Sequence, residues 1–490
     1  MNESDNWPPE ESPRSSIADL FPHVYESEPE TAPAEPPNEP PAFVPPQPET
    51  TANKRSCWFT GGILVLVFSL LMSVIASALW VFEQSQWGTA VSPPASAGRI
   101  VYINQNGQIV TIDPDGNNGR LLTHDDFTYQ FPAWSPDGSQ VAAIGQDAIY
   151  LLPDNETADP LNLYTNARQN PFYLYWSPDG RYLSFLTNDL QHGIGLRLVS
   201  ADASEEARLL ATGSPFYWNW TLDSQRMLIH TGAAGEDARL ALLSTDSFDD
   251  AEDIAPPGSF QAPGISADGR YWAYAEDKGD GTSWLVVTNQ ENDQDWMERH
   301  LGMVALGWSP TEPYLAFTNG AQERSVTFWG PLRLFDAASG ETRLLSASTT
   351  LAFFWSPDGR YLATINAGNT NHDFGVNVAQ ADNGRRPLLG KASGQSSPHQ
   401  FNLTVINVET GEEALLLTFS PSVLYISQFL PFFDQYALSH RIWSPNSDAL
   451  VLPILEDSGS HVVIVPIDGS PVTDLGRGEM PFWSASSDSS

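Results

Sequence analysis

The chain has 490 residues, of which 60 are acidic and 23 are lysine or arginine, so its formal net charge is −37. This balance argues against a nucleic-acid-binding function, because phosphate contacts need clustered cations and an acidic chain repels a polyanion. The single cysteine excludes an intramolecular disulfide and metal sites built on several thiolates.

The N-terminal segment, residues 1–56, is rich in acid and proline. Its first 53 residues hold 11 acidic residues, one arginine and 13 of the 39 prolines. Such a segment buries too little apolar surface to offset the entropy lost on ordering. We expect a disordered cytoplasmic tail that serves either as a solvated spacer or, through its polyproline II stretches, as a ligand for a groove-type partner domain.

An apolar segment without any charged residue follows, from Cys57 to Phe82. At about 1.5 Å of rise per residue, a helix of this length exceeds the roughly 30 Å hydrocarbon core of a bilayer. Residues 57–82 are therefore predicted to form a transmembrane helix. Lys54 and Arg55 precede it, so the positive-inside rule places the tail in the cytoplasm and the C-terminal part outside. This makes the chain a single-pass, type II protein of the cell membrane, with a short stalk over residues 83–98.

The rest of the chain, residues 99–485, carries a repeated motif. Trp-Ser-Pro-Asp-Gly occurs three times, and degenerate copies keep the same period. The first positions of the copies are Trp134, Trp176, Trp220, Ile265, Trp308, Trp355, Trp443 and Trp483. Their spacings are 42, 44, 45, 43, 47, 88 and 40 residues, and a period of roughly 40–45 residues is typical of a four-stranded propeller blade.

The motif also has the chemistry of a tight turn. Proline presets φ, aspartate hydrogen-bonds nearby backbone, and glycine tolerates the conformation at the exit of the turn. Each copy is followed by a strand-forming run, so the predicted fold is all-β: an eight-bladed β-propeller, with seven blades as the alternative. The last copy has no strands after it and the first strand, which starts at Arg99, has no copy before it. We expect the two to complete one blade and close the ring.

The 88-residue spacing contains extra chain. Residues 367–400 are rich in Gly, Asn, Ser and Gln, and are predicted to be a surface loop inserted into the propeller. Residues 418–440 form a long apolar connector between blades. This connector is expected to be either a packed cap or an exposed patch that binds a partner.

The three perfect copies of Trp-Ser-Pro-Asp-Gly, and strands after motif copies such as Tyr314-Leu-Ala-Phe, resemble the TolB-like propeller family, which has WD-like repeats. The resemblance covers residues 99–485. It implies a propeller fold and, because the family includes the periplasmic protein-interaction component TolB, a protein-binding role. Similar propellers form substrate-gating domains in prolyl oligopeptidases and in the tricorn protease, so the resemblance alone does not select one function.

Sequence motifs of hydrolytic enzymes do not occur. The chain lacks both Gly-x-Ser-x-Gly and His-Glu-x-x-His, and its histidines are scattered singly. Aspartates recur at one turn position, and we interpret them as turn residues rather than calcium ligands; they are Asp137, Asp179, Asp223, Asp268 and Asp358. We therefore expect no catalytic residue, no metal site and no cofactor.

A ligand of a propeller is expected over the central channel, where loops of several blades converge. The segments that enter the motif strands are aromatic, and alternate residues of a strand point to opposite faces, so part of them pack between blades and part face the channel. The candidate ligand funnel consists of Tyr173, Tyr217, Phe353, His440 and Arg441.

These features predict a non-catalytic, extracytoplasmic binding or scaffold propeller at the cell envelope. Its partner is expected to be a protein or peptide, with a cationic partner favoured by the 49 acidic and 20 basic residues after position 55. Two alternatives remain: an enzyme of the sugar-lyase or hydrolase type on the propeller face, and a sensor that signals through the tail.

Overall fold

The computed structural model describes residues 98–155, 159–189, 193–232, 238–246, 251–279, 282–292, 294–322, 325–368 and 400–485. The predicted tail, transmembrane helix and stalk lie outside these ranges except for Gly98, and so do residues 369–399 of the predicted surface loop. Among the described residues, no helix has the length and apolar character needed to cross a membrane.

The described strands form antiparallel meanders in which each strand pairs with the next along the chain. Four of the sheets have four strands each. The first is β4 (Tyr129–Trp134), β5 (Gln140–Gly145), β6 (Ala148–Pro153) and β7 (Leu161–Thr165). The second is β8 (Pro171–Trp176), β9 (Tyr182–Asp189), β10 (Gly193–Ser200) and β11 (Arg208–Gly213). The third is β12 (Phe216–Trp220), β13 (Arg226–Thr231), β14 (Arg239–Ser244) and β15 (Glu252–Ala255). The fourth is β16 (Gly264–Ile265), β17 (Tyr271–Asp277), β18 (Ser283–Asn289) and β19 (Gln294–His300).

A fifth sheet has seven strands because one long strand belongs to two consecutive meanders. It comprises β20 (Val304–Trp308), β21 (Tyr314–Asn319), β22 (Gly330–Asp336), β23 (Glu341–Trp355), β24 (Tyr361–Ala367), β25 (Phe401–Asn407) and β26 (Glu413–Phe419). Residues 341–346 of β23 pair with β22, whereas residues 352–355 pair with β24. The register shifts between the two parts, so β23 ends one meander and begins the next.

The sixth sheet joins the two ends of the propeller. It comprises β27 (Ala449–Glu456), β28 (Gly459–Pro466), β29 (Thr473–Trp483), β1 (Ile100–Asn104), β2 (Ile109–Ile112) and β3 (Arg120–Leu121). The first part of β29 pairs with β28, and its last residues pair with β1, with Trp483 opposite Ile100 and Phe482 opposite Val101. This confirms the predicted pairing of the last motif strand with the first strand of the propeller.

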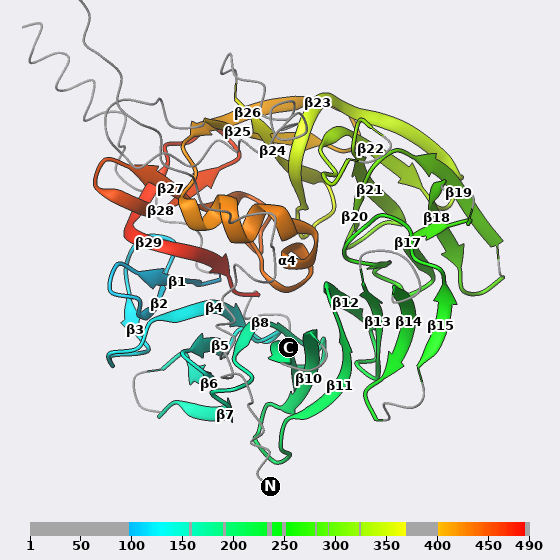
Figure 1. The fold of residues 1–490 in the computed structure, drawn as a ribbon. Helices are drawn as coiled ribbons and strands as arrows, with labels where there is room; N and C mark the ends of the chain where they lie inside the picture. Colours follow the sequence, from blue (N-terminus) through cyan, green and yellow to red (C-terminus); the bar gives the residue numbers. More distant parts are fainter. Residues whose placement is uncertain are drawn as a thin grey trace, which may run out of the picture. The chain divides into compact units, whose positions relative to one another are not determined.

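The sheets are arranged radially around a short helix, α4 (Phe433–Ser439), as Figure 1 shows. The helix contacts β8, β12, β20 and β23, which are strands that end in a copy of the motif. The motif strands therefore lie innermost in the propeller, and the later strands of each meander lie progressively outward.

The motif turns have the geometry that their sequence predicts. Ser177 Oγ donates to Asp179 Oδ1 at 2.7 Å, and the same oxygen accepts from the Arg181 N–H at 3.0 Å. The same pair of bonds recurs at Asp268 and Asp358. The interpretation of these aspartates as turn residues is thus confirmed. Glycine ends the turn in the left-handed region, as at Gly180 with φ of +70°.

The motif tryptophans connect neighbouring meanders. In each of four pairs, the indole N–H donates to the carbonyl of the residue that precedes the motif position of the preceding meander. The pairs are Trp134 to Phe482 O at 3.2 Å, Trp176 to Ala133 O at 3.1 Å, Trp355 to Gly307 O at 2.9 Å and Trp443 to Phe354 O at 3.0 Å. We call these contacts the indole bridges. Four of the seven tryptophans at the motif position make this contact.

The apolar connector of residues 418–440 is packed rather than exposed. It forms a π-helical turn, η2 (Tyr425–Phe429), a 3-10 turn, η3 (Leu430–Phe432), and α4. Its buried apolar side chains are Phe419, Pro421, Tyr425, Phe429, Leu430, Phe433 and Tyr436. The first of the two expectations for this connector, a packed cap, is therefore confirmed.

Candidate functional site

Helix α4 occupies the place where the candidate ligand funnel was predicted. Tyr173, Tyr217, Phe353 and His440 are 6%, 7%, 2% and 3% exposed, whereas Arg441 is exposed. The structure thus brings these residues to the centre of the propeller and covers four of them. The ligand-binding role assigned to them stays a prediction.

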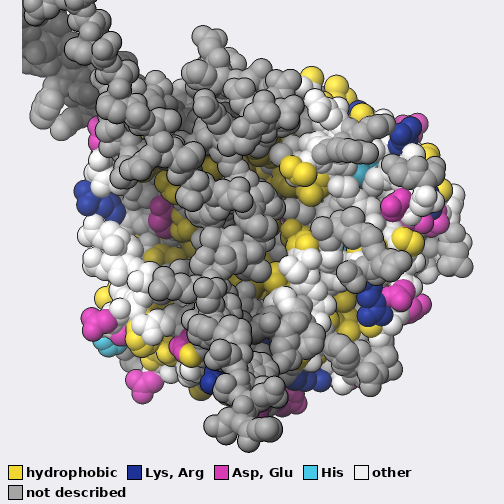
Figure 2. Space-filling view, in the orientation of Figure 1, with side chains coloured by type: hydrophobic (Ala, Val, Ile, Leu, Met, Phe, Trp, Pro, Cys, Tyr) yellow, Lys and Arg dark blue, Asp and Glu magenta, His cyan; other side chains and the backbone are white. Residues whose placement is uncertain are grey.

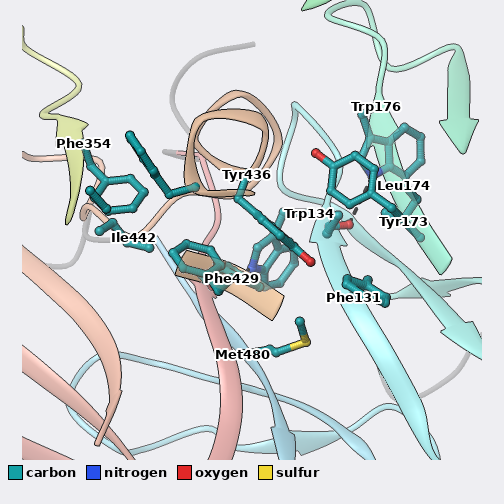
Figure 3. Packing of buried hydrophobic residues seen from close by; sticks show 14 of the residues in the cluster. Phe131, Trp134, Tyr173, Leu174, Trp176, Phe354, Phe429, Tyr436, Ile442 and Met480 are labelled. Atoms are coloured by element: carbon teal, nitrogen blue, oxygen red, sulfur yellow. Dashed lines mark hydrogen bonds between the residues drawn. The ribbon is translucent and has the colours of Figure 1, made fainter. Parts of the chain in front are cut away.

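Tyr173 ties the innermost strand β8 to the helix. Its hydroxyl donates to Gln435 O at 3.0 Å and lies 2.5 Å from Ser439 Oγ. Its ring meets that of Tyr436 edge to face, with centroids 5.3 Å apart. Figure 3 shows Tyr436 pointing from α4 toward the rings of Tyr173 and Phe131. These contacts fix the helix against the channel wall.

The side-chain amide of Gln435 pairs with the backbone of β12 in the way that a neighbouring strand would. The side-chain Oε1 of Gln435 accepts from the Trp218 N–H at 2.9 Å, and its Nε2 donates to Trp218 O at 2.9 Å. The innermost strand β12 has no further strand on that side, so its inward backbone groups would otherwise remain unpaired. The side-chain amide of Gln435 therefore satisfies both backbone groups of Trp218 that face the centre of the propeller.

His440 and Phe353 complete the packing around the helix. The His440 ring lies 4.5 Å from that of Phe482, and its Nδ1 lies 2.6 Å from Ser439 Oγ. Burial lowers the pKa of His440 to about 3, so the ring is neutral at physiological pH. Phe353 meets Phe433 of α4 edge to face at 5.1 Å.

Tyr217 lies one strand position away from Trp218 and faces a different neighbour. Its ring stacks on His230 at 6.0 Å, and His230 stacks on Phe260 at 4.1 Å. His230 Nδ1 is hydrogen-bonded to Gln261 O at 2.9 Å, which requires the proton on Nδ1. Burial lowers the pKa of His230 to about 4, so this histidine is neutral as well.

Arg441 is the exposed member of the candidate set. The Arg441 side chain reaches solvent, but partial loss of solvation lowers the pKa of its guanidinium group. The nearby Tyr175 opposes this shift. The Tyr175 hydroxyl lies 3.4 Å from Asn219 Oδ1, which extends this polar group toward β12.

Asp434 is a polar residue of the site that the sequence reasoning missed. Its Oδ2 accepts from the Ala262 N–H at 3.2 Å, and its Oδ1 accepts from the Gln435 N–H at 2.9 Å. Burial raises the pKa of Asp434 to about 7, because these two bonds do not offset the loss of solvation. The signal was present in the sequence, since Asp434 is the only acidic residue in the connector 418–440.

A pocket of about 120 Å³ lies beside this carboxyl group. It is bounded by α4 through Asp434 and Leu438, and by the motif strands β12, β16 and β20 through Asn219, Ile265 and Trp308. In the described part of the chain, no three His, Cys, Asp or Glu side chains come together as a metal site would require. The polar side chains that line the pocket are the carboxyl group of Asp434, the amide group of Asn219, the hydroxyl group of Ser309 and the indole of Trp308, whose N–H has no acceptor among the described residues.

No protein-family model and no curated protein matches the sequence. Solved structures do match. TolB from Acinetobacter baumannii is 15% identical over 80% of this chain and 68% of its own, with a TM-score of 0.37. Putative TolB from Agrobacterium tumefaciens is 15% identical over 66% of this chain and 90% of its own, with a TM-score of 0.33. A eukaryotic initiation factor is 12% identical over 79% of this chain and 99% of its own, with a TM-score of 0.47.

The chain is similar to TolB-like β-propellers. At these identities and TM-scores, the similarity concerns the fold alone, and the arguments that follow rest on the strand pairing and side-chain contacts of this chain.

Proposed function

We propose that this chain is a non-catalytic propeller that binds a protein or peptide partner at the cell envelope. The observation that supports it most is the use of the polar groups at the propeller centre. The Tyr173 hydroxyl and the Gln435 side chain join α4 to the inner strands β8 and β12, and His440 is buried at the end of the helix, so the centre is built as a fixed support for the surrounding surface.

The propeller of this proposal has eight blades. Its motif strands come from β4, β8, β12, β16, β20, the second half of β23, the segment around Trp443 and the end of β29. The segment around Trp443 is represented by a single bridge to Leu450 of β27, which makes it the weakest of the eight. The division of β23 and β29 between two neighbours each supports this count.

The proposal also includes the anchor. Residues 57–82 hold the propeller outside the cytoplasm, with the N-terminal tail inside. Protease treatment of intact cells that express the full chain tests this: we expect an N-terminal tag to be protected and a C-terminal tag to be removed. The opposite pattern would reject the topology without touching the fold.

The charge of the chain favours a cationic partner. Acidic side chains repel anionic surfaces and steer positively charged proteins toward the propeller. In the described surface that Figure 2 shows, charged side chains lie mainly toward the rim, whereas hydrophobic side chains are more frequent toward the centre. This distribution fits steering by the rim followed by apolar contact.

Cross-linking in native membranes, followed by reconstitution of the captured partner with the purified full chain, tests the function. We expect direct binding that weakens when the salt concentration rises from 50 to 200 mM. Added salt shortens the Debye length, which is about 10 Å at 0.1 M, and so screens the attraction between the acidic propeller and a cationic partner. Binding that is independent of salt would contradict the electrostatic part, and the absence of any direct partner would contradict the function.

An enzyme on the propeller face is the second candidate, and the raised pKa of Asp434, about 7, favours it. A general acid or base works best with a pKa near the operating pH. The two bonds of this carboxyl group go to backbone N–H groups that fix α4, which is why we rank the binding function first.

A further inference from the structure

The repeat is interrupted in one meander, that of β16–β19. The six other copies that are followed by a strand all have tryptophan at the position of Ile265. The perfect copies have proline at the position of Ala267. Four of the seven motif tryptophans form indole bridges, and a tryptophan at position 265 with their geometry would donate to the carbonyl of Asn219, which precedes Trp220. Isoleucine has no indole group, so this bridge is missing between β12 and β16.

The pocket described above occupies the place of the missing bridge. Asn219, Ile265 and Ala267 all line it, and its volume of about 120 Å³ equals that of about four water molecules, at roughly 30 Å³ each. The pocket is therefore a consequence of the local change in sequence. Its opposite wall is formed by Leu438 and Asp434 of helix α4.

The buried carboxyl group of Asp434 favours a positively charged ligand in this pocket. The carboxyl group is 3% exposed, its hydrogen-bond donors in the described chain are the N–H groups of Ala262 and Gln435, and no cation contributes to its electrostatic environment. A buried carboxylate without a counter-charge is costly, and a positively charged group in the pocket would remove that cost.

We propose that the pocket between β12, β16 and α4 binds an aliphatic primary ammonium group, carried either by a lysine side chain of the partner or by a free amine. This inference rests on the proposed binding function and assigns it a chemical class. Asp434 supplies the counter-charge, and the amide oxygen of Asn219 is a second acceptor for the ammonium hydrogens. Ile265 and Leu306 provide apolar walls for the methylene stem.

The geometry favours an ammonium over a guanidinium group. Arginine binds carboxylates best through two parallel bonds, one to each oxygen. Both oxygens of Asp434 already accept a backbone N–H, which leaves single lone pairs rather than an open fork. An ammonium group donates its three hydrogens in separate directions and needs only one of them for the carboxylate.

Calorimetric titration of the purified full chain at pH 8 tests the proposal. The ligands are n-butylammonium chloride and a short peptide with one lysine, and their neutral counterparts are n-butanol and the same peptide with norleucine. We expect saturable binding of at least one ammonium ligand and at least tenfold weaker binding of its neutral counterpart. Preference for the peptide identifies a partner side chain, and preference for butylammonium identifies a free amine. Equal binding of charged and neutral ligands, or no binding at all, would overturn the proposal.

Asp434→Asn separates the charge from the structural role. The amide oxygen of asparagine can still accept the Ala262 N–H while the pocket loses its charge, but the bond from the Gln435 N–H is lost because the amide nitrogen is a donor. We expect at least a tenfold loss of affinity for the ammonium ligand. Glu479→Gln is the control, because it removes a charge from a second acid, which is half-buried, accepts from Ser422 Oγ and lies outside this pocket. Equal affinities of Asp434→Asn and the unmodified protein would overturn the proposal.

Ile265→Trp provides a second, independent variant. The indole is expected to fill the pocket and to abolish ammonium binding without lowering the thermal midpoint, since it restores the repeat. Retained affinity in a folded Ile265→Trp variant would contradict the location. If the captured partner binds Asp434→Asn as tightly as the unmodified protein, the pocket inference fails while the proposed function stands.

Discussion

Asp434 is a carboxyl group that the propeller buries between backbone N–H groups without a cation. Its raised pKa means that the folded protein binds a proton more tightly there than the unfolded chain does. The folded state is therefore favoured at pH values where the group is neutral, and this advantage is lost as the pH rises from about 4 to about 7. The difference in pKa corresponds to a free energy on the order of 4 kcal/mol.

Asp434→Asn should remove this pH-dependent cost. We expect the variant to be more stable than the unmodified protein at pH 8, by up to a few kcal/mol, and of nearly equal stability near pH 4, where the carboxyl is protonated in the folded state and about half protonated in the unfolded chain. Urea unfolding of both proteins at the two pH values measures this. The comparison must be made as a difference, because burial lowers the pKa of His440 to about 3 and of His230 to about 4, which destabilises both proteins below about pH 6.5. A variant that is less stable at pH 8 would show that the charge is compensated.

The residues of the site differ in how far the sequence predicts them. The motif aspartates could be interpreted correctly, because each one bonds within its own turn, as Asp179 does with Ser177. Gln435 and Asp434 could not, because their partners, Trp218 and Ala262, are 217 and 172 residues away along the chain. Local chemistry is readable from a sequence, whereas the partner of a buried polar group depends on the assembled ring.

Among the elements, the motif strands show why tryptophan recurs. The indole bridges supply one buried hydrogen bond between neighbouring meanders, and the bulky ring fills the space between them. Three motif tryptophans make no such bond: the indole N–H of Trp220 donates to Ser184 Oγ, and those of Trp308 and Trp483 have no acceptor among the described residues. The chain thus contains an internal comparison of bonded and unbonded copies.

Trp443→Phe and Trp483→Phe use this comparison. Both side chains are 2% exposed, but only Trp443 donates to a carbonyl, that of Phe354 at 3.0 Å. Replacing Trp443 loses the bond and leaves a buried carbonyl without its donor, for which we expect a cost about 1–3 kcal/mol larger than that of Trp483→Phe. Chemical denaturation of the two variants gives the difference. Equal losses of stability would mean that the tryptophans act through ring volume alone.

The elements were predictable to the extent that they repeat. Strands that follow a motif, such as β9 and β24, were expected from their β-forming runs, and the structure has them there. The connector was expected as apolar chain, with its packed form left open, because hydrophobic composition does not state which surface covers it. Its helix α4 has neither a side-chain N-cap nor a basic last turn, so local signals for a helix were missing.

At the scale of the whole molecule, the charge opposes compactness. With 60 acidic and 23 basic residues, like charges repel each other more strongly in the folded protein than in the expanded chain. We therefore expect the thermal midpoint to rise between 10 and 150 mM sodium chloride, as the Debye length falls from about 30 to about 8 Å. Differential scanning calorimetry measures this shift. A midpoint that falls with added salt would indicate that attractive ion pairs outweigh the repulsion.

Closure of the ring makes its stability depend on the last strand. Residues 478–483 of β29 pair with β1, and they bury Met480, Phe482 and Trp483 to 5% exposure or less. Each of these side chains contributes roughly 2 kcal/mol by burial, and their loss would also expose β1 as an open edge.

Deletion of residues 479–490 should therefore lower the thermal midpoint of the full chain by about 10 °C or more. Truncation after Ala485 keeps the paired residues and is the control, for which we expect little change. The two truncations differ only in whether β1 has its inner neighbour. If both have the midpoint of the intact protein, the pairing of the chain ends contributes nothing to stability, and the packing of neighbouring meanders against each other and against α4 is sufficient to hold the propeller together.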